Sequence, residues 1–462
     1  MSTTTENSGL SISERLADWL VGLDPAAVPA GAGDAALNTT IDIIGLCLAA
    51  RENDYTKAAL TAWDSNGPCT VFGVGQTRDL YGAALINGTA SHGEDFDNTF
   101  EGCPVHSGAV IVPTILALAE SEGIEGKRTV AAMAVGIELM CRLGLVADKS
   151  VHTAGFHPTA ILGTMAAAAA SGVMLGLDRR QFVDALGVAG SMASGIIEYL
   201  SDGSWTKRMH PGWAAQAGIR AARMGQAGFR GPRTVFEGEH GLFKAFGPSI
   251  TPDFSHLVDG LGSTWQAGNV AFKPYACGTM TQPYIDCAIA LRNDGVRAED
   301  IAEIVCETAH GTVHRLWEPL KLKQQPPNGY AAKFSTPYCV AVGLIDGAGG
   351  LQQFTDERVA DPQILALAGR VRYEIDPDNE YPLNYTGHLR ALLKDGRTVE
   401  KRQPTLRGGV RQPMDRDELI AKYRMNASYG GIEKAKSDAV LEAVLSLATN
   451  GSASTIGETA RR

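Results

Sequence analysis

Apolar and small residues recur at helical spacing from about residue 10 to residue 265, and strand signals are almost absent over that length. The spacing is clearest in TVAAMAVGIELMCRLGLVAD, DRRQFVDALGVAGSMASGIIEYL and HPGWAAQAGIRAARMGQAGF. In the last of these, Pro211 suits the first position of a helix, and Gly228 stands near its end. The pattern predicts a large all-helical domain.

One stretch, PTAILGTMAAAAASGVMLGL at residues 158–177, carries no charge and is as long as a membrane span. Its apolarity comes largely from alanine and glycine, and His152, His157 and the segment DRR flank it. We interpret it as a buried core helix whose small residues let neighbouring helices approach closely. A transmembrane helix is the less favoured alternative.

The pattern changes after residue 265. The segments IAEIVCETAHG, RVRYEIDPDNEYP and GHLRALLKDGRTVEKR alternate apolar and polar residues, and KDGR is a candidate hairpin turn. Helical spacing returns in MDRDELIAKYRMNA and SDAVLEAVLSLATN, while the last dozen residues have a composition typical of disorder. We predict a mainly α protein. A large helical domain, made from residues 1–265 and 405–462, is joined to a smaller α+β lid domain at residues 266–404.

The composition limits the partners. The 462 residues carry a formal net charge of -10 with no concentrated basic face, which argues against a nucleic-acid partner. The eight cysteines are scattered without a C-x-x-C pair, as expected of free thiols in a reducing cytoplasm. The first residues are polar and show no export signal ahead of the first amphipathic helix, so we expect a cytoplasmic protein.

The stretch HGEDFDNTFEGCPVH begins at His92 and ends at His106. Together with Asp95 and Asp97, these histidines offer ligands that suit zinc or manganese, as in a metal-dependent hydrolase. The structural alternative is that Asp97 or Asn98 caps a helix and His92 is a core histidine. The stretch alone leaves both interpretations open.

The sequence motifs do not support a nucleotide-binding site. The segment FGVGQTRDL contains a G-x-G, but Arg78 stands where the third glycine is needed, and no βαβ pattern surrounds it. The phosphate-binding pattern G-x-x-x-x-G-K-[ST] and the nucleophile pattern G-x-S-x-G do not occur.

Ionisable residues recur at breaks between the small-residue helices. His157 precedes a proline at a predicted helix start, and His106 in VHSG is placed similarly. Lys207, Arg208 and His210 fall in a predicted loop before another helix. A ring aimed at the free N–H groups of a helix start has a lowered pKa and stays available as a neutral base. The arrangement predicts a cleft with acid/base chemistry.

A series of motifs resembles the MmgE/PrpD family in family order, across about residues 15–440. The motifs are NGTASHGEDFDNTF followed by CPVHSGAVIVPTILALAE, then GFHPTAILGT, DGSWTKRMHPGWAAQAGI, FEGEHGLF, KPYACGTMTQPYIDCA and AKFSTPYCVA. The family includes 2-methylcitrate dehydratase, cis-aconitate decarboxylase and iminodisuccinate epimerase. The resemblance implies a helical domain, an α+β lid, a cleft between them, a homodimer, and chemistry without cofactor or metal.

The resemblance also implies site residues. The predicted catalytic residues are His106, His157, Lys207 and Asp95, and the predicted substrate-binding residues are Thr99, Arg208, His210 and Lys273. The chain departs from the family at KPYACGTMTQP. Many members carry a histidine a few residues after the lysine-proline pair, where this chain has Cys277, Gly278 and Gln282.

The chemistry shared by the family is proton transfer at a carbon next to a carboxylate. We expect an epimerase acting on a polycarboxylate amino-acid derivative such as iminodisuccinate. The lid histidine is missing, and within the family the resemblance looks closest to iminodisuccinate epimerase. A hydro-lyase or decarboxylase on 2-methylcitrate- or aconitate-like acids is the alternative within the family. A metal-dependent hydrolase and a non-catalytic helical scaffold are the alternatives outside it. The expected partners are a small polycarboxylate and a second copy of the chain, without nucleic acid or membrane.

Overall fold

The computed structural model describes residues 9–124 and 126–461, so the predicted polar segment at residues 1–8 lies outside the described residues. The chain is 58% helical and only 8% strand, which confirms the predicted mainly α class. It divides into two compact units. The first unit comprises residues up to Gly93, Asp97–Val270, and residues from Leu419, and the second unit comprises Glu94–Phe96 and Ala271–Glu418.

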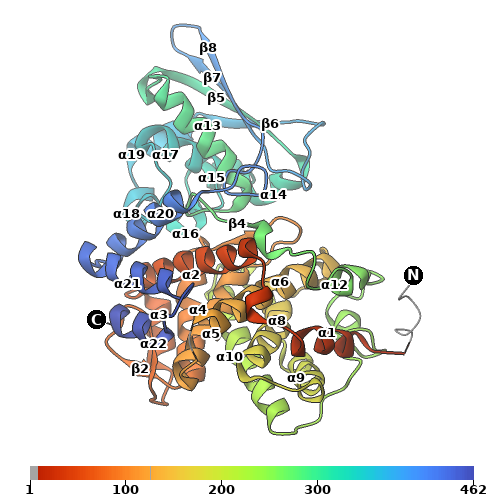
Figure 1. Ribbon diagram of the computed structural model, residues 1–462. Helices are drawn as coiled ribbons and strands as arrows, with labels where there is room; N and C mark the ends of the chain where they lie inside the picture. Colours follow the sequence, from red (N-terminus) through yellow and green to blue (C-terminus); the bar gives the residue numbers. More distant parts are fainter. Residues whose placement is uncertain (1–8, 125, 462) are drawn as a thin grey trace. The chain divides into compact units, whose positions relative to one another are not determined.

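The first unit is a bundle of helices (Figure 1). Its helices before residue 270 are α1 Ile12–Val21, α2 Ala30–Ala50, α3 Asp54–Thr61, α4 Leu80–His92, α5 Ser107–Glu122, α6 Gly126–Ala147, α7 Ser150–Thr153, α8 Pro158–Leu175, α9 Arg179–Met192, α10 Thr206–Gln226, α11 Leu242–Phe246 and α12 Ser255–Val258. Short strands accompany them, namely β1 Cys69–Thr70, β2 Thr77–Arg78 and β3 Thr99–Phe100, and β4 Val270–Ala271 stands where the chain passes into the second unit. Helix α8 packs against α5, α6, α9 and α10, which places it at the centre of the unit.

Small residues set the distances between these helices. A Cβ added at Gly218 of α10 would lie 2.4 Å from the Cβ of Ala167 in α8. A Cβ added at Gly88 of α4 would lie 2.5 Å from the Cα of Gly212 in α10. The helices therefore approach at distances that a larger side chain would prevent.

Among the described residues, three helices, α2, α6 and α8, are long and apolar enough to cross a membrane by length and composition. The apolar windows are 83%, 89% and 94% buried inside the structure, respectively. Burial of α8 agrees with the prediction of a core helix built from alanine and glycine.

The chain returns to the first unit through its last helices, α20 Arg416–Tyr429, α21 Lys434–Ser446 and α22 Ala453–Ala460. Lys422 of α20 forms a buried ion pair with Asp42 of α2, with 2.7 Å between Nζ and Oδ1. The predicted disorder of the last dozen residues is wrong for those described. Ser452 caps α22 by accepting a hydrogen bond from the backbone N–H of Thr455.

The second unit is built on a four-stranded sheet of order β6-β5-β7-β8 (Figure 1). The strands are β5 Ile301–Thr308, β6 Val371–Ile375, β7 Gly387–Leu393 and β8 Thr398–Gln403. β5 pairs parallel to β6 and antiparallel to β7, and β7 pairs antiparallel to β8. The segment KDGR joins β7 to β8, as predicted for a hairpin.

Helix α13 Gln282–Asn293 packs on β7 and β8, and α17 Thr336–Asp346 contacts β6. The other helices of the unit are α14 Val313–Leu316, α15 Leu320–Gln324, α16 Gly329–Ala332, α18 Asp356–Val359 and α19 Pro362–Ala368. The approach of α13 is close, because a Cβ at Gly387 of β7 would lie 2.6 Å from the backbone of Pro283 in α13. Other sheet side chains form ion pairs, such as Arg372 with Glu303 and Arg390 with Glu374.

The compact units do not coincide with the predicted segments 266–404 and 405–462. The second unit extends to Glu418 because Arg407 pairs with Glu418, and because Gly408 accepts a hydrogen bond from the backbone N–H of Phe272. Residues 94–96 also belong to it, although the chain on both sides belongs to the first unit.

Candidate active site

Four buried histidines gather in the first unit. They lie at the end of α4 (His92), at the N-caps of α5 (His106) and α8 (His157), and in the first turns of α10 (His210). The ring centre of His92 is 4.8 Å from that of His106 and 5.7 Å from that of His157. The rings of His157 and His210 are 5.3 Å apart. Helices distant in sequence thus bring four imidazoles into one cluster.

His157 and His210 form a linked pair. Their Nδ1 atoms are 3.2 Å apart, so one proton between them makes a hydrogen bond and two would repel. Burial holds the pKa of His157 well below its usual value, and the charges of His92 and Lys207 lower it further. Burial likewise lowers the pKa of His210 to about 4. The free pair is therefore neutral near pH 7.

The physical cause of these shifts differs from the predicted one. His106 and His157 are N-caps as expected, but neither ring makes a capping hydrogen bond to its helix. Removal from water, rather than the helix N-terminus, is the largest cause of the lowered pKa of His157.

The predicted loop before α10 is also wrong, because α10 begins at Thr206 and contains Pro211 in its interior. Lys207, Arg208 and His210 are therefore helical residues. The first turn begins where the N–H of Arg208 donates to the carbonyl of Trp205. A proline this close to a helix start removes only one backbone hydrogen bond, so the sequence pattern misplaced the boundary by about one turn.

Asp97 orients two of the histidines. Its Oδ2 lies 2.8 Å from Nδ1 of His92 and 3.4 Å from Nδ1 of His106, and all three side chains are buried. Nδ1 of His106 is also 3.0 Å from the carbonyl oxygen of Asn98. Fixing Nδ1 of an imidazole selects the tautomer and leaves Nε2 for other chemistry.

Asn98 caps α5 from outside the helix. Its Oδ1 accepts a 2.9 Å hydrogen bond from the N–H of Gly108, and its Nδ2 donates to Oγ of Ser107. The capping role considered for Asn98 is thus present, and it coexists with the histidine cluster.

Three of the four predicted metal ligands meet. The ligand atoms of His92, Asp97 and His106 all lie within 4.8 Å of one another, and all three residues are buried. Two imidazoles and one carboxylate are a donor set that zinc or manganese accepts. The fourth predicted ligand, Asp95, belongs to the second unit, where Lys273 binds it.

The other predicted site residues of the first unit, Lys207, Arg208 and Thr99, have different surroundings. Lys207 is close enough for its charge to lower the pKa of both His157 and His210. The guanidinium of Arg208 instead lies 4.5 Å from the ring centre of Tyr55, in a cation–π contact. Thr99 is buried in β3.

Asp95 and Lys273 meet within the second unit. Nζ of Lys273 donates to the backbone oxygen of Asp95 at 2.7 Å and lies 3.4 Å from its Oδ2. The neighbouring Glu94 is bound by buried Lys333, with 3.0 Å between Nζ and Oε2. Asp95 has a φ of 54°, a left-handed conformation that non-glycine residues rarely adopt. The two lysines hold this strained turn in place.

One residue beside the histidine cluster was not predicted. Tyr199, in the short helix Glu198–Leu200, has its ring centre 6.2 Å from that of His157 and 5.9 Å from that of His210, and the sequence around it carries no motif. Gln282 is buried, and its amide donates to the carbonyls of Tyr275 and Cys277. Gln282, one of the three residues in the region where many family members carry the lid histidine, thus has a structural role within the second unit.

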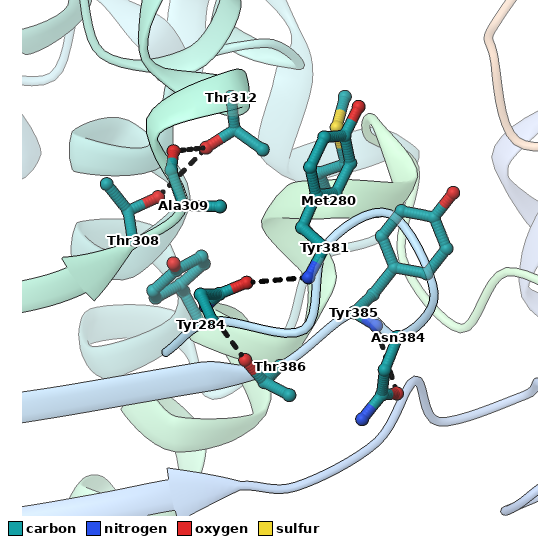
Figure 2. A pocket seen from close by; sticks show the side chains of 10 residues that line it. Met280, Tyr284, Thr308, Ala309, Thr312, Tyr381, Asn384, Tyr385 and Thr386 are labelled. Carbon is teal, nitrogen blue, oxygen red and sulfur yellow. Dashed lines mark hydrogen bonds between the residues drawn. The ribbon is translucent and has the colours of Figure 1, made fainter. Parts of the chain in front are cut away.

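The second unit also holds a small pocket beside Thr308 and Tyr381 (Figure 2). Its volume is about 10 Å³, roughly enough for one water molecule. None of the described residues that line it is charged, and many of its polar groups bond to each other, as the hydroxyls of Thr308 and Thr312 do at 3.0 Å. It does not suit a polycarboxylate.

Comparison with known proteins agrees with the motif order. Residues 14–255 match the MmgE/PrpD N-terminal domain, and residues 275–447 match the MmgE/PrpD C-terminal domain. The chain belongs to the MmgE/PrpD family. Human cis-aconitate decarboxylase is 30% identical to this family member over 410 residues, which are 86% of this chain and 81% of the human protein. Cis-aconitate decarboxylase of Aspergillus terreus is 26% identical over 445 residues, 90% of this chain and 89% of the fungal protein.

Proposed function

We propose that this member of the MmgE/PrpD family is a cofactor-independent lyase that decarboxylates a small unsaturated polycarboxylate resembling cis-aconitate. The observation that carries the proposal is the buried His157–His210 pair beside Lys207. The names of its relatives support decarboxylation over the epimerisation expected from the sequence.

The proposed reaction needs a cation and a proton donor. When the carbon–carbon bond to a carboxylate breaks and carbon dioxide leaves, the bonding electrons stay on the substrate as a carbanion. Lys207 stabilises this negative charge. The histidine pair then delivers a proton to the carbon and regains one from water.

The low pKa of the pair fits this role. In the free protein the imidazoles are neutral, because burial and the nearby positive charges disfavour the imidazolium. A bound polycarboxylate brings negative charge beside them, which favours the protonated form. Protonation of the donor is thereby coupled to substrate binding.

The linked pair also bears on epimerisation. A two-base epimerase needs two independent groups on opposite faces of the carbon. His157 and His210, with 3.2 Å between their Nδ1 atoms, act as a single acid/base unit. Epimerisation remains a second candidate, because this chain has Cys277, Gly278 and Gln282, and no histidine, in the segment where a lid acid would be expected.

The test is an NMR experiment in D2O with protein treated with a chelator. Cis-aconitate, 2-methylcitrate and iminodisuccinate are incubated separately. The proposal predicts carbon dioxide and a product with one deuterium, bound at the carbon where the carbanion is protonated. Deuterium incorporation with inversion and no loss of mass would establish the epimerase. Activity that is lost on chelation and restored by zinc would favour the metal centre of His92, Asp97 and His106.

A further inference from the structure

The second unit contains a cavity of about 410 Å³, which is within the size range of small-molecule sites. Segments that are separate in sequence form its wall. They are the end of α13, the residues just before β5, the end of α17, helix α19 with the residue Arg370 after it, and the β7–β8 turn. Its lining residues are Arg292, Arg297, Ala298, Glu299, Leu344, Ile345, Gln363, Ala366, Leu367, Arg370 and Lys394. All of them belong to the second unit, so the cavity does not involve the histidine cluster.

The lining is strongly cationic. Three arginines and one lysine face a single acidic residue, Glu299. Among the described residues, Arg292, Arg297 and Arg370 form no ion pair, whereas arginines of the neighbouring sheet such as Arg372 are each paired with glutamate. The cavity therefore gathers cations without carboxylate partners in a protein whose net charge is -10.

Two of the arginines are held in place by the backbone. Nη1 of Arg292 donates to the carbonyl of Leu344 at 3.0 Å, at the end of α17. Nη1 of Arg370 donates to the carbonyl of Ile301 at 2.8 Å. These bonds use one nitrogen of each guanidinium and restrict its rotation. A fixed guanidinium loses less entropy when its remaining N–H groups bind an anion.

We propose that this cavity is a second ligand site, which binds a small molecule carrying two or more carboxylate or phosphate groups. The arginines and Lys394 bind the anionic groups by charge-assisted hydrogen bonds. Leu344, Ala366 and Leu367 contact the carbon skeleton between them.

Isothermal titration of the whole protein tests the site, with inorganic pyrophosphate and 1,2,3-propanetricarboxylate as the two probes. Arg297 and Lys394 are both exposed, so R297Q/K394Q should fold normally. The double variant should weaken binding of at least one probe by about tenfold or more. The probe that is affected tells whether phosphate or carboxylate is preferred.

Arg315 supplies the matched control, because it is an exposed arginine of the same unit that does not line the cavity. Binding by R315Q should equal that of the wild type. Lys207→Ala changes the proposed active site and leaves the lining of the cavity intact. Binding of the probes at the cavity should therefore persist in that variant. Wild-type affinity of R297Q/K394Q for both probes would overturn the proposal. Loss of binding of both probes in Lys207→Ala would also overturn it.

Discussion

At the residue scale, the buried pair makes stability depend on pH. The pKa of His210 falls from 6.5 in the unfolded chain to about 4 in the folded protein, so the folded state favours the neutral ring. This stabilisation is complete above about pH 6.5 and is lost as pH falls toward 4, where the unfolded chain binds the extra proton. We predict a loss of about 3 kcal/mol from His210 over this range. Urea unfolding at several pH values should show a flatter dependence for His210→Asn. An identical dependence in the variant would contradict the assignment.

Lys207 gives a second prediction. Lys207→Ala should reduce kcat/KM by roughly a hundredfold, about 3 kcal/mol of transition-state stabilisation, without loss of the fold. Because the charge of Lys207 lowers the pKa of His157, the pH profile should also shift upward in the variant. Steady-state kinetics with circular dichroism measure both effects. Lys127→Ala, which removes an exposed lysine of α6, is the control. Near-normal kcat/KM in folded Lys207→Ala would remove this role.

Much of the histidine cluster could be predicted from sequence. His106 and His157 stand at helix starts, and such breaks are visible in the pattern of small residues. The link between His157 and His210 could not be predicted, because it depends on how α8 and α10 pack. The shared use of Asp97 by two imidazoles depends in the same way on α4 and α5.

At the element scale, the crossing of α4 and α10 positions the site. A Cβ at Gly212 would lie 2.0 Å from the carbonyl oxygen of Leu85, so Gly212→Ala must separate these helices. We predict a loss of about 1–3 kcal/mol or more in the free energy of unfolding, and lower activity because α10 carries Lys207 and His210. Gly31→Ala in α2 is the control, since nothing lies within 4 Å of an added Cβ. Equal stability of the two variants in urea unfolding would contradict this account.

Element types were easier to predict than element ends. Helical spacing located α6, α8 and α9, and KDGR located the hairpin of β7 and β8. The start of α10 was misplaced because proline usually occupies the first turn of a helix. Here α10 begins at Thr206, and Pro211 lies in the helix interior. Helix α22 was missed because its short, small-residue sequence gains its stability by packing against α5 and α21.

At the scale of the whole molecule, the sequence predicted two units. It did not predict that residues 94–96 belong to the second unit while the chain on both sides belongs to the first. This assignment depends on Lys333 and Lys273, which lie far along the chain from the acidic residues they bind. Pairings of this kind leave no periodic signal in the sequence. The same reason explains why the second unit extends to Glu418.

The homodimer implied by the family resemblance remains a proposal, and α10 offers a face for it. Trp205, Met209 and Trp213 are spaced four residues apart and are 48%, 38% and 39% exposed. An exposed apolar stripe of this kind is typical of interfaces. Sedimentation velocity should show a dimer of the 48.8 kDa chain in the wild type and a monomer for Trp213→Glu. Leu383→Glu, at an exposed leucine of the second unit, should stay dimeric. A dimeric Trp213→Glu protein would exclude this face.

If His157 and His210 act as one acid/base unit, a double-mutant cycle on kcat should show it. His157→Gln and His210→Gln are measured singly and together on the substrate found by NMR. We predict that kcat of the slower single variant falls by about 10²–10⁴-fold, and that the double variant is hardly slower than this single variant. Effects that multiply in the double variant would show two independent groups and contradict the claim.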